Sequence, residues 1–227
     1  MRWFVTVCMG AALTAAPFAW ADVPAAARAA DVVFLGEVHD NPAHHAVQAE
    51  WVRALAPGAV VFEMLPARID QTAITAHLDD PEALARILDW EARGWPDFAM
   101  YYPIFQAAQT AEIRGAEVPR DQVRVLMEAP LSDAFGAQAQ MFGLDAELPE
   151  GQQAMREALQ FAAHCDALPK DMLPMMVNVQ RLRDAVLAEV ALAVHQELAV
   201  RLGGPVVVIT GNGHARKDWG APAALAL

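Results

Sequence analysis

The chain has 227 residues, of which 16 are Lys or Arg and 28 are Asp or Glu, so its formal net charge is −12. An acidic protein of this kind is a poor partner for nucleic acids or anionic lipid headgroups, and we expect it to bind no nucleic acid. Its length and its 56% hydrophobic residues suit one sizeable domain with an ample core.

The first 21 residues have the features of a signal peptide that is removed on export. Arg2 provides a positive start, residues 3–18 are apolar, and Ala19-Trp20-Ala21 fits an A-x-A cleavage site. The apolar stretch is too short and too close to this site for a membrane span. We therefore expect an exported protein, periplasmic or envelope-associated, whose mature chain begins near Asp22.

The segment 31–50 predicts a buried strand followed by a polar loop and a capped helix. Residues 32–35 form a short β-rich apolar run, and an Asn-Pro pair at 41–42 suits the start of a helix. Glu37 and His39 lie between them, where open α/β sheets bind their ligands. Loops between strands and helices are often polar, but this one is dense enough in acids and histidines to be a candidate site.

Two further apolar runs predict strands whose ends carry polar side chains. Residues 59–62 are followed at once by Glu63, which either faces the first loop or only caps the next helix. Residues 206–210 are followed by Gly-Asn-Gly and His214, and the glycines allow a close approach of the backbone to a ligand. A weaker strand is expected at 115–118.

If the strands are parallel, Glu37, His39, Glu63 and His214 converge at one edge of the sheet, and two chemistries remain open. Glu37, His39 and His214 are plausible ligands for a divalent metal with a position left for water. Alternatively, the four side chains form a metal-free acid–base group, with His39 or His214 as general base. Either would suit a hydrolase of ester or amide bonds. No G-x-S-x-G motif supports a serine nucleophile.

Helical patterns occupy most of the remaining chain. The predicted helices lie at 67–91 as two helices, at about 102–113 with Pro103 in the first turn, at 152–167, and at 170–202. Residues 129–151 are rich in turns and small residues and predict an irregular, mobile connection beside a pocket.

Three side-chain groups on these helices have both an ordinary and a functional interpretation. The aromatic segment 94–105 forms either core or the wall of an apolar pocket that carries two phenol groups. The methionine-rich stripe 172–179 forms either core or a contact with a flat ligand. Arg181 and Asp184 are spaced as a solvated salt bridge of small worth.

Six motifs make the chain resemble the ChaN-like haem-binding uptake family, of the superfamily that includes the Tiki proteins and erythromycin esterases. They are LGEVHDNPAHH, VVFEM, GWPDFAMYYPIF, HCDALPKDM, QRLRD and GNGHARKDWG. The resemblance implies a single α/β domain over 22–227, a mostly parallel central sheet flanked by helices, and a helical insertion at about 67–114 and 120–202. It also implies an exported haem-binding protein of haem and iron uptake. The superfamily's GExH and GxGH motifs fall on Glu37, His39 and His214.

The resemblance further implies a haem ligand, which we expect to be a phenol or an imidazole. Tyr101 is the first candidate and His164 the second. The residues expected to contact the ring are Met172, Met175, Met176 and Phe105, and Arg181 or Arg120 is expected to pair with a propionate. Expected partners are haem and envelope haem-uptake components, and a homodimer is left open.

The sequence departs from the family pattern in three places. Cys8 is not followed by a lipoprotein cleavage pattern, and its removal leaves Cys165 without an internal disulfide partner. Tyr102 stands where the family has a basic residue after Tyr101. Because the family continues beyond the GxGH motif into another strand, this chain is expected either to lack an edge strand or to be truncated. In the second case the strand 206–210 is expected to lack a neighbour.

Overall fold

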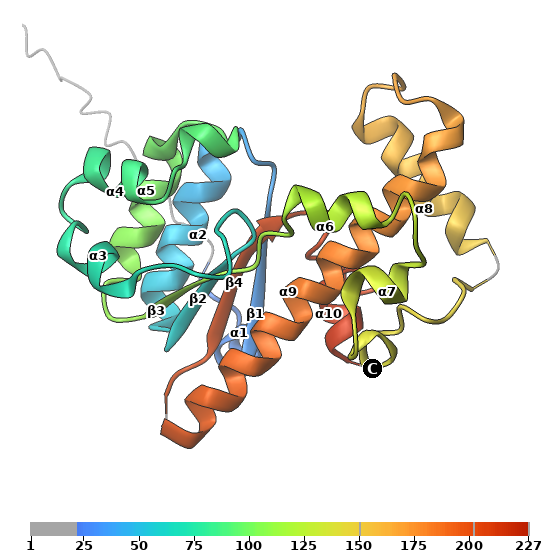
Figure 1. Cartoon of the computed structure of the whole chain (residues 1–227). Coiled ribbons are helices and arrows are strands. Elements are labelled where there is room, and N and C mark those ends of the chain that lie inside the picture. The colour runs from blue at the N-terminus through green and yellow to red at the C-terminus, as the bar shows by residue number, and fades with distance from the viewer. Residues whose placement is uncertain (1–21, 150, 202, 227) are drawn as a thin grey trace, which may run out of the picture.

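The computed structural model describes residues 22–149, 151–201 and 203–226, and its centre is a four-stranded sheet (Figure 1). The strands are β1 (Val32–Glu37), β2 (Ala59–Phe62), β3 (Glu112–Gly115) and β4 (Val206–Gly211). Their order across the sheet is β1-β4-β2-β3, and every neighbouring pair is parallel. The predicted α/β class with a parallel central sheet is confirmed. The predicted signal peptide, residues 1–21, lies outside the described residues.

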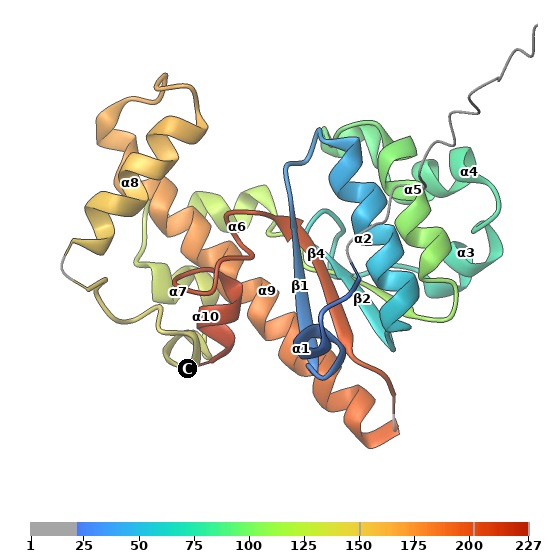
Figure 2. The same cartoon turned by 180° about the vertical axis from the view of Figure 1, so that it is seen from behind.

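Helices cover both faces of the sheet (Figures 1 and 2). On one face α2 (Pro42–Leu55) packs beside α5 (Phe98–Ala107), with α3 (Gln71–Ala76) and α4 (Pro81–Ile87) outside them. On the other face α9 (Leu173–Arg201) crosses the sheet and continues into a second helical lobe. The remaining elements are α1 (Ala25–Arg28), α6 (Arg120–Val125), α7 (Leu131–Phe135), α8 (Gln152–Ala163), α10 (Ala221–Leu225) and the 3-10 turns η1 (Glu91–Arg93), η2 (Ala139–Phe142) and η3 (Lys170–Met172).

The strands are apolar on both faces because both faces are covered, as expected for a parallel sheet. In β2, Val60 and Phe62 face the layer of α2 and α5, whereas Ala59 and Val61 face α9. All four are buried. Among the described helices, none is both long and apolar enough to cross a membrane.

The last strand in the chain, β4, lies in the middle of the sheet. It pairs with β1 on one side, where Glu37 is opposite Gly211, and with β2 on the other, where Phe62 is opposite Ile209. The expectation that residues 206–210 lack a neighbour is therefore wrong. Both edges of β4 are covered, because the two earliest strands flank it.

The edge strand β3 begins three residues before the predicted strand 115–118. Its side chains alternate between buried Ile113 and the polar Glu112 and Arg114, which pair with each other and with charged residues of α9. A search for apolar runs misses such a strand, because half of its side chains face water. The strand ends at Gly115, where an added Cβ would lie 2.0 Å from the carbonyl oxygen of Pro66.

Two helical predictions also need correction. The helix predicted to begin near Tyr102 begins at Phe98, because the Asp97 side chain caps it by accepting a hydrogen bond from the Ala99 amide at 2.9 Å. Pro103 consequently lies inside the helix and not in its first turn. The segment 129–151, predicted to be irregular, contains α7 and η2, which pack against α9.

Candidate functional site

The carboxyl end of β1 places Glu37 in a buried hydrogen-bonded cluster. Its Oε1 accepts hydrogen bonds from His39 Nδ1 at 2.8 Å and from the Tyr101 hydroxyl at 2.5 Å. Its Oε2 lies 3.3 Å from Nδ1 of His45. Burial alone would raise the pKa of Glu37, but hydrogen bonds from His39, His45 and Tyr101 outweigh it and lower that pKa to about 2. Glu37 is therefore a fixed carboxylate that orients three side chains.

His39 connects Glu37 to the end of β4. Since its Nδ1 donates to Glu37, its Nε2 is left as the acceptor. That nitrogen lies against Gly211, where an added Cβ would be 3.1 Å from it and 3.7 Å from Glu63 Oε2. The ring contacts the edge of Trp95 at a centroid distance of 5.1 Å, and the side chain is about one-third exposed. His39 is thus the solvent-accessible imidazole of the cluster.

Glu63, directly after β2, is held by the end of β4. Its Oε2 accepts hydrogen bonds from the Thr210 hydroxyl at 2.6 Å and from the Gly211 amide at 2.8 Å. Its Oε1 lies 3.5 Å from Nε2 of His214. Burial alone would raise the pKa of Glu63, but the charge of His214 and these two hydrogen bonds lower it.

His214 lies between two carboxylates. Its Nδ1 donates to Asp184 Oδ1 at 2.6 Å, and its Nε2 faces Glu63. Burial alone would lower the pKa of His214, but the charges of Glu63 and Asp184 raise it to about 9. His214 is therefore a buried imidazolium at neutral pH, whereas His39 offers a free ring nitrogen.

Asp184 is the main functional residue that the sequence interpretation missed. It was predicted to form a solvated salt bridge with Arg181, but it is 2% exposed and binds His214. Arg181 instead donates from Nη2 to the carbonyl oxygens of Gly143 and Ala146, at 2.8 and 2.9 Å. The two side chains thus have different hydrogen-bond partners, Arg181 the 143–146 backbone and Asp184 the His214 ring.

The structure brings the four residues Glu37, His39, Glu63 and His214 to one edge of the sheet. Among the described residues, however, no group of three or more His, Cys, Asp or Glu side chains is arranged to hold a metal ion. Both nitrogens of His214 already face carboxylates, and Nδ1 of His39 is bound to Glu37. The arrangement fits an acid–base network better than a set of metal ligands.

A small cavity opens beside Glu63. Its volume is about 250 Å³, and its walls include Trp95 and three arginines, Arg93, Arg120 and Arg183. Arg93 is paired with Glu117. The cavity gives the carboxyl edge of the sheet a place for a small ligand. Arg120, one of the two candidates for a haem propionate, lies here.

Tyr101, the first candidate for the haem ligand, is in the protein interior. It has no exposed surface, and its hydroxyl donates to Glu37. Burial and the nearby Glu37 carboxylate raise the pKa of Tyr101 above its ordinary value, which opposes formation of a phenolate. In this arrangement Tyr101 offers no free oxygen to an iron atom.

The second candidate, His164, is exposed at the end of α8. Its Nδ1 lies 2.8 Å from the Gln160 carbonyl oxygen, so Nδ1 donates and Nε2 is free to accept or to bind a metal. Met172 is exposed and Met176 is half-buried at the start of α9, across the turn that joins the two helices. The fold therefore places His164, Met172 and Met176 on one helical hairpin, far along the chain from Tyr101.

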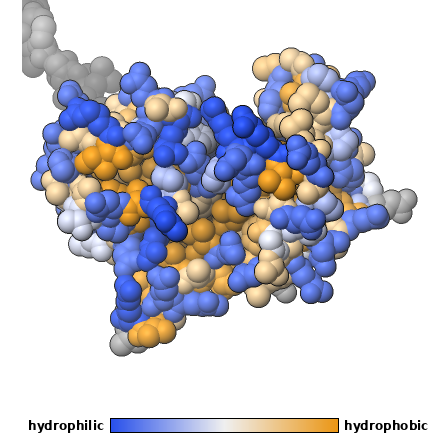
Figure 3. Space-filling view, in the orientation of Figure 1, coloured by the Kyte–Doolittle hydropathy of each residue, from blue (hydrophilic) through white to orange (hydrophobic). Residues whose placement is uncertain are grey.

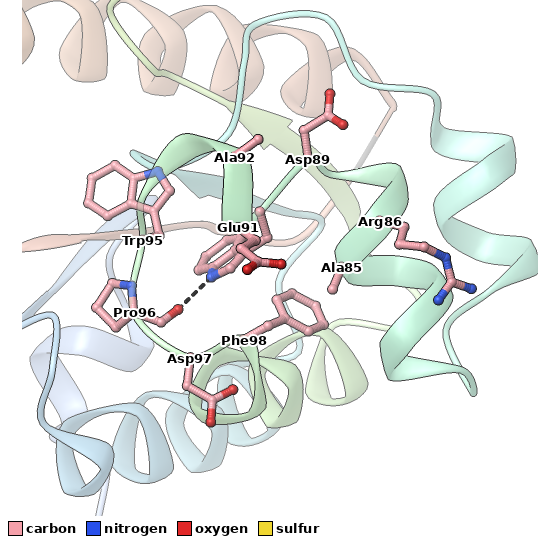
Figure 4. A pocket seen from close by; sticks show the side chains of 10 residues that line it. Ala85, Arg86, Asp89, Glu91, Ala92, Trp95, Pro96, Asp97 and Phe98 are labelled. Atoms are coloured by element: carbon pink, nitrogen blue, oxygen red, sulfur yellow. Dashed lines mark hydrogen bonds between the residues drawn. The ribbon is translucent and has the colours of Figure 1, made fainter.

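The aromatic segment 94–105 forms core and pocket wall at once. Tyr101 and Phe105 are fully buried in the core. Trp95 and Phe98 instead line a cavity of about 870 Å³, shown in Figure 4, where the Trp90 indole donates to the Pro96 carbonyl oxygen at 2.6 Å. The pocket wall predicted from the sequence is present, but it carries indole and phenyl rings and no phenol.

The two buried charges predict a bell-shaped dependence of stability on pH. The pKa of His214 rises from 6.5 to about 9 on folding, so its contribution is complete below pH 6.5 and is lost as pH rises through about 9. The pKa of Glu37 falls from 4.5 to about 2, so its contribution is complete above pH 4.5 and is lost as pH falls through about 2. Urea unfolding across this range should give the largest unfolding free energy between pH 4.5 and 6.5. Glu37→Gln should flatten only the acid side, and an unchanged acid side in that variant would contradict this assignment.

A family model described as "Haem-binding uptake, Tiki superfamily, ChaN" matches residues 23–225. A solved structure described as "Cofacial heme binding to ChaN of Campylobacter jejuni" aligns with a TM-score of 0.60 at 19% identity, over 88% of this chain and 77% of that one. The type III effector HopBA1 aligns at 15% identity over 83% and 70% of the two chains, but its TM-score of 0.47 is too low to support an argument. Among curated proteins, none matches.

Proposed function

Because the chain belongs to the haem-binding uptake family of the Tiki superfamily, the ChaN family, we propose that it is an exported haem-binding protein that serves haem and iron uptake. The observation that carries this proposal is the family match over residues 23–225, nearly all of the described chain. The shared fold with ChaN of C. jejuni, described as binding haem cofacially, supports it. Export is proposed from the signal-peptide features of residues 1–21.

The hairpin of α8 and α9 is the best place for the haem. Its large apolar side chains remain exposed, including Met155 at 53%, Leu159 at 45% and Met172 at 39%. Figure 3 shows moderately hydrophobic residues over the top of this hairpin. Exposed apolar surface of this kind marks binding sites, and a porphyrin ring would cover it. A second copy of the chain or an envelope haem-uptake component would cover the opposite face of the ring.

His164 is the iron ligand in this proposal. An imidazole whose Nδ1 is fixed by a backbone carbonyl presents Nε2 in one tautomer and one orientation, which is how proteins prepare histidine for a metal. Neither arginine expected to pair with a propionate supports this placement, since Nη2 of Arg181 is already bound to two backbone carbonyls and Arg120 lines the cavity beside Glu63.

A haemin titration of residues 22–227 tests the proposal. We expect saturable binding with a shifted and sharpened Soret band, and elution of haem with the protein in gel filtration. The elution volume with and without haemin also measures whether haem brings two copies together. A protein that shows only the unsaturable absorbance of free haemin would overturn the haem proposal.

A second function is favoured by one observation. Four side chains, which we call the acid–imidazole cluster, lie beside a cavity at the carboxyl edge of the sheet: Glu37, His39, Glu63 and His214. His39 is oriented by Glu37 and keeps its Nε2 free, which is the arrangement of a general base that activates water. The imidazolium of His214 lies next to it and suits the negative charge that develops on the substrate oxygen, whereas the Glu63 carboxylate suits the positive charge that His39 gains on taking up a proton. This geometry suits hydrolysis of an ester or amide bond.

Hydrolysis of an activated aryl ester separates this second function from the first. Loss of the base in His39→Ala should abolish turnover, since base catalysis contributes roughly 100-fold to 10,000-fold. His195→Ala, on α9 and away from the loop that carries His39, is the control and should retain activity. Equal rates for the wild type, both variants and buffer would remove the hydrolase alternative and leave the haem proposal untouched.

A further inference from the structure

We propose that a pocket between α8, α9 and α10 binds a small hydroxycarboxylate, held by Arg156 and Asp184. α9 packs against both α8 and α10, and the pocket lies between the start of α8, the middle of α9 and the segment that leads into α10. Residues 142–149 complete the pocket wall. The pocket uses the first two turns of α8, whereas His164 lies at the other end of that helix, and it is separate from the cavity beside Glu63. The proposal is tested without haem.

The pocket has the size and composition of a site for a small organic molecule. Its volume is about 300 Å³, at the lower end of the range usual for ligand sites. Apolar side chains form much of its wall, and buried charged groups interrupt that wall at two points, Arg156 and Asp184. The apolar lining residues include Phe142, Leu144, Leu148 and Trp219. An apolar pocket with a few fixed polar groups is the usual form of a specific binding site.

Arg156 is the first of these polar groups, and one nitrogen of its buried guanidinium lacks a hydrogen-bond partner among the described residues. The residue is 6% exposed, and its Nε and Nη2 both donate to one neutral acceptor, Oε1 of Gln152, at 3.1 and 2.8 Å. Its Nη1 is buried and has no hydrogen-bond partner among the described residues. Because a buried N–H donor without a hydrogen-bond partner is costly, an anionic oxygen at Nη1 would be favoured.

Trp219 and Arg181 hold the site around this guanidinium. The indole ring of Trp219 lies 5.4 Å from Cζ of Arg156 and 4.0 Å from Cζ of Arg216. Arg181 ties the 142–149 segment to α9 through the Gly143 and Ala146 carbonyls. The pocket is therefore assembled by contacts that leave Nη1 of Arg156 free.

Asp184 supplies the second polar group and specifies the ligand further. Its Oδ1 accepts from His214, but its Oδ2 is buried and has no partner among the described residues. A ligand that satisfies both orphan atoms needs a carboxylate for Arg156 and a hydroxyl that donates to Asp184. A carboxylate with an adjacent hydroxyl on a small apolar body has this chemistry. Because Asp184 also binds His214, a ligand in the pocket would change the hydrogen bonding of His214 in the acid–imidazole cluster.

Isothermal titration calorimetry with three related probes tests the ligand chemistry on the wild-type protein. Mandelate carries both groups on a phenyl ring, phenylacetate lacks the hydroxyl, and benzyl alcohol lacks the carboxylate. We expect saturable binding of mandelate, weaker binding of phenylacetate, and no saturable binding of benzyl alcohol. Absence of saturable heat with mandelate would mean that only water occupies the pocket and would overturn the proposal. Equal binding of benzyl alcohol would overturn it as well.

Two arginine variants test the residue assignment. Arg156→Met should weaken mandelate binding by about tenfold or more, as expected for the loss of a charged hydrogen bond. Arg216→Met is the matched control, because Arg216 stacks on the same Trp219 ring but does not line the pocket. It should bind mandelate as the wild type does. Equal losses in the two variants would assign the effect to the indole and contradict the role of Arg156.

Arg156→Lys and the NMR signal of His214 extend the test. The lysine variant keeps the charge, so it should fold even if Arg156→Met does not, and it should bind mandelate more weakly than the wild type. Mandelate should also shift the imidazole resonances of His214 in the wild-type protein, because its hydroxyl shares Asp184 with that ring. Saturable mandelate binding that leaves His214 unmoved would place the probe elsewhere and overturn the assignment to this pocket.

Discussion

His164→Ala is expected to weaken haemin binding by roughly tenfold or more, because even residues that only orient a metal ligand contribute that much to affinity. His164 is exposed, and its side chain makes one hydrogen bond in the described structure, with the Gln160 carbonyl, so truncation to alanine should leave the fold intact. The measurement is a haemin titration followed in the Soret region. His195→Ala, a change on α9 at the end away from the hairpin, is the control and should bind haemin as the wild type does.

Tyr101→Phe distinguishes the two candidate ligands. We expect an unchanged haem spectrum and a lower free energy of unfolding, by about 1.5–3 kcal/mol, because the variant loses a hydrogen bond to a charged acceptor. Tyr102→Phe, which loses only a bond to the Leu78 carbonyl, should cost about 0.5–1.5 kcal/mol. If the Tyr101 variant instead lost a phenolate charge-transfer band, the tyrosine would be the ligand and the interior would have to open on haem binding.

Gly115→Ala is expected to destabilise the protein by about 3 kcal/mol or more, the upper range for added bulk in a packed site. The new Cβ would lie 2.0 Å from the Pro66 carbonyl oxygen and 2.3 Å from that of Leu65. Both are backbone atoms, so relief requires the segment after β2 to move. Because Glu63 belongs to the same segment, the change should also disturb the acid–imidazole cluster.

Urea unfolding measures this effect, and Gly213→Ala provides the control. A Cβ at Gly213 would meet only the end of the Gln180 side chain, at 3.3 Å, which can rotate away. We expect that variant to unfold at nearly the wild-type urea concentration. Similar midpoints for the two alanine variants would show that the Pro66 segment can move at little cost and that its close approach to Gly115 does not contribute to stability.

The strongest strands could be predicted from the sequence, whereas their order could not. The runs at 32–35, 59–62 and 206–210 are apolar on both sides, which only a covered parallel sheet explains. Strand order depends on how the long helical connections cross the faces of the sheet, and no short sequence pattern predicts this. The edge strand at 112–115 was misplaced because it alternates polar and apolar side chains and pairs with charges from a helix distant in sequence.

The convergence of Glu37, His39, Glu63 and His214 could be predicted because each follows a strand. Their hydrogen-bond partners on helices, such as Asp184, do not follow strands and could not be found in this way. The helical spacing does indicate that Asp184 is buried, since it places Asp184 on one face of α9 with the buried Val177, Ala188 and Ala191. An acid on such a face is buried and needs a partner. The same pattern applies to His45, which shares the buried face of α2 with Val52.

Tyr101 illustrates the limit of a residue type as evidence. Its place in an aromatic segment suited both a haem ligand and a core residue, and the choice depends on what faces its oxygen. That partner is Glu37, which lies 64 positions earlier in the chain. Tyr101 lies on α5 and Glu37 at the end of β1, and α2, which packs against both elements, is the link between them.

The central position of β4 determines when the sheet can be completed during folding. Until residues 206–211 are available, β1 and β2 lack the strand that joins them, and each keeps an open edge on that side. Contacts between such distant parts of a chain form slowly, because a long loop must close first. A partially synthesised chain therefore holds Glu37 and Glu63 on unconnected strands and exposes two strand edges that can pair with other chains.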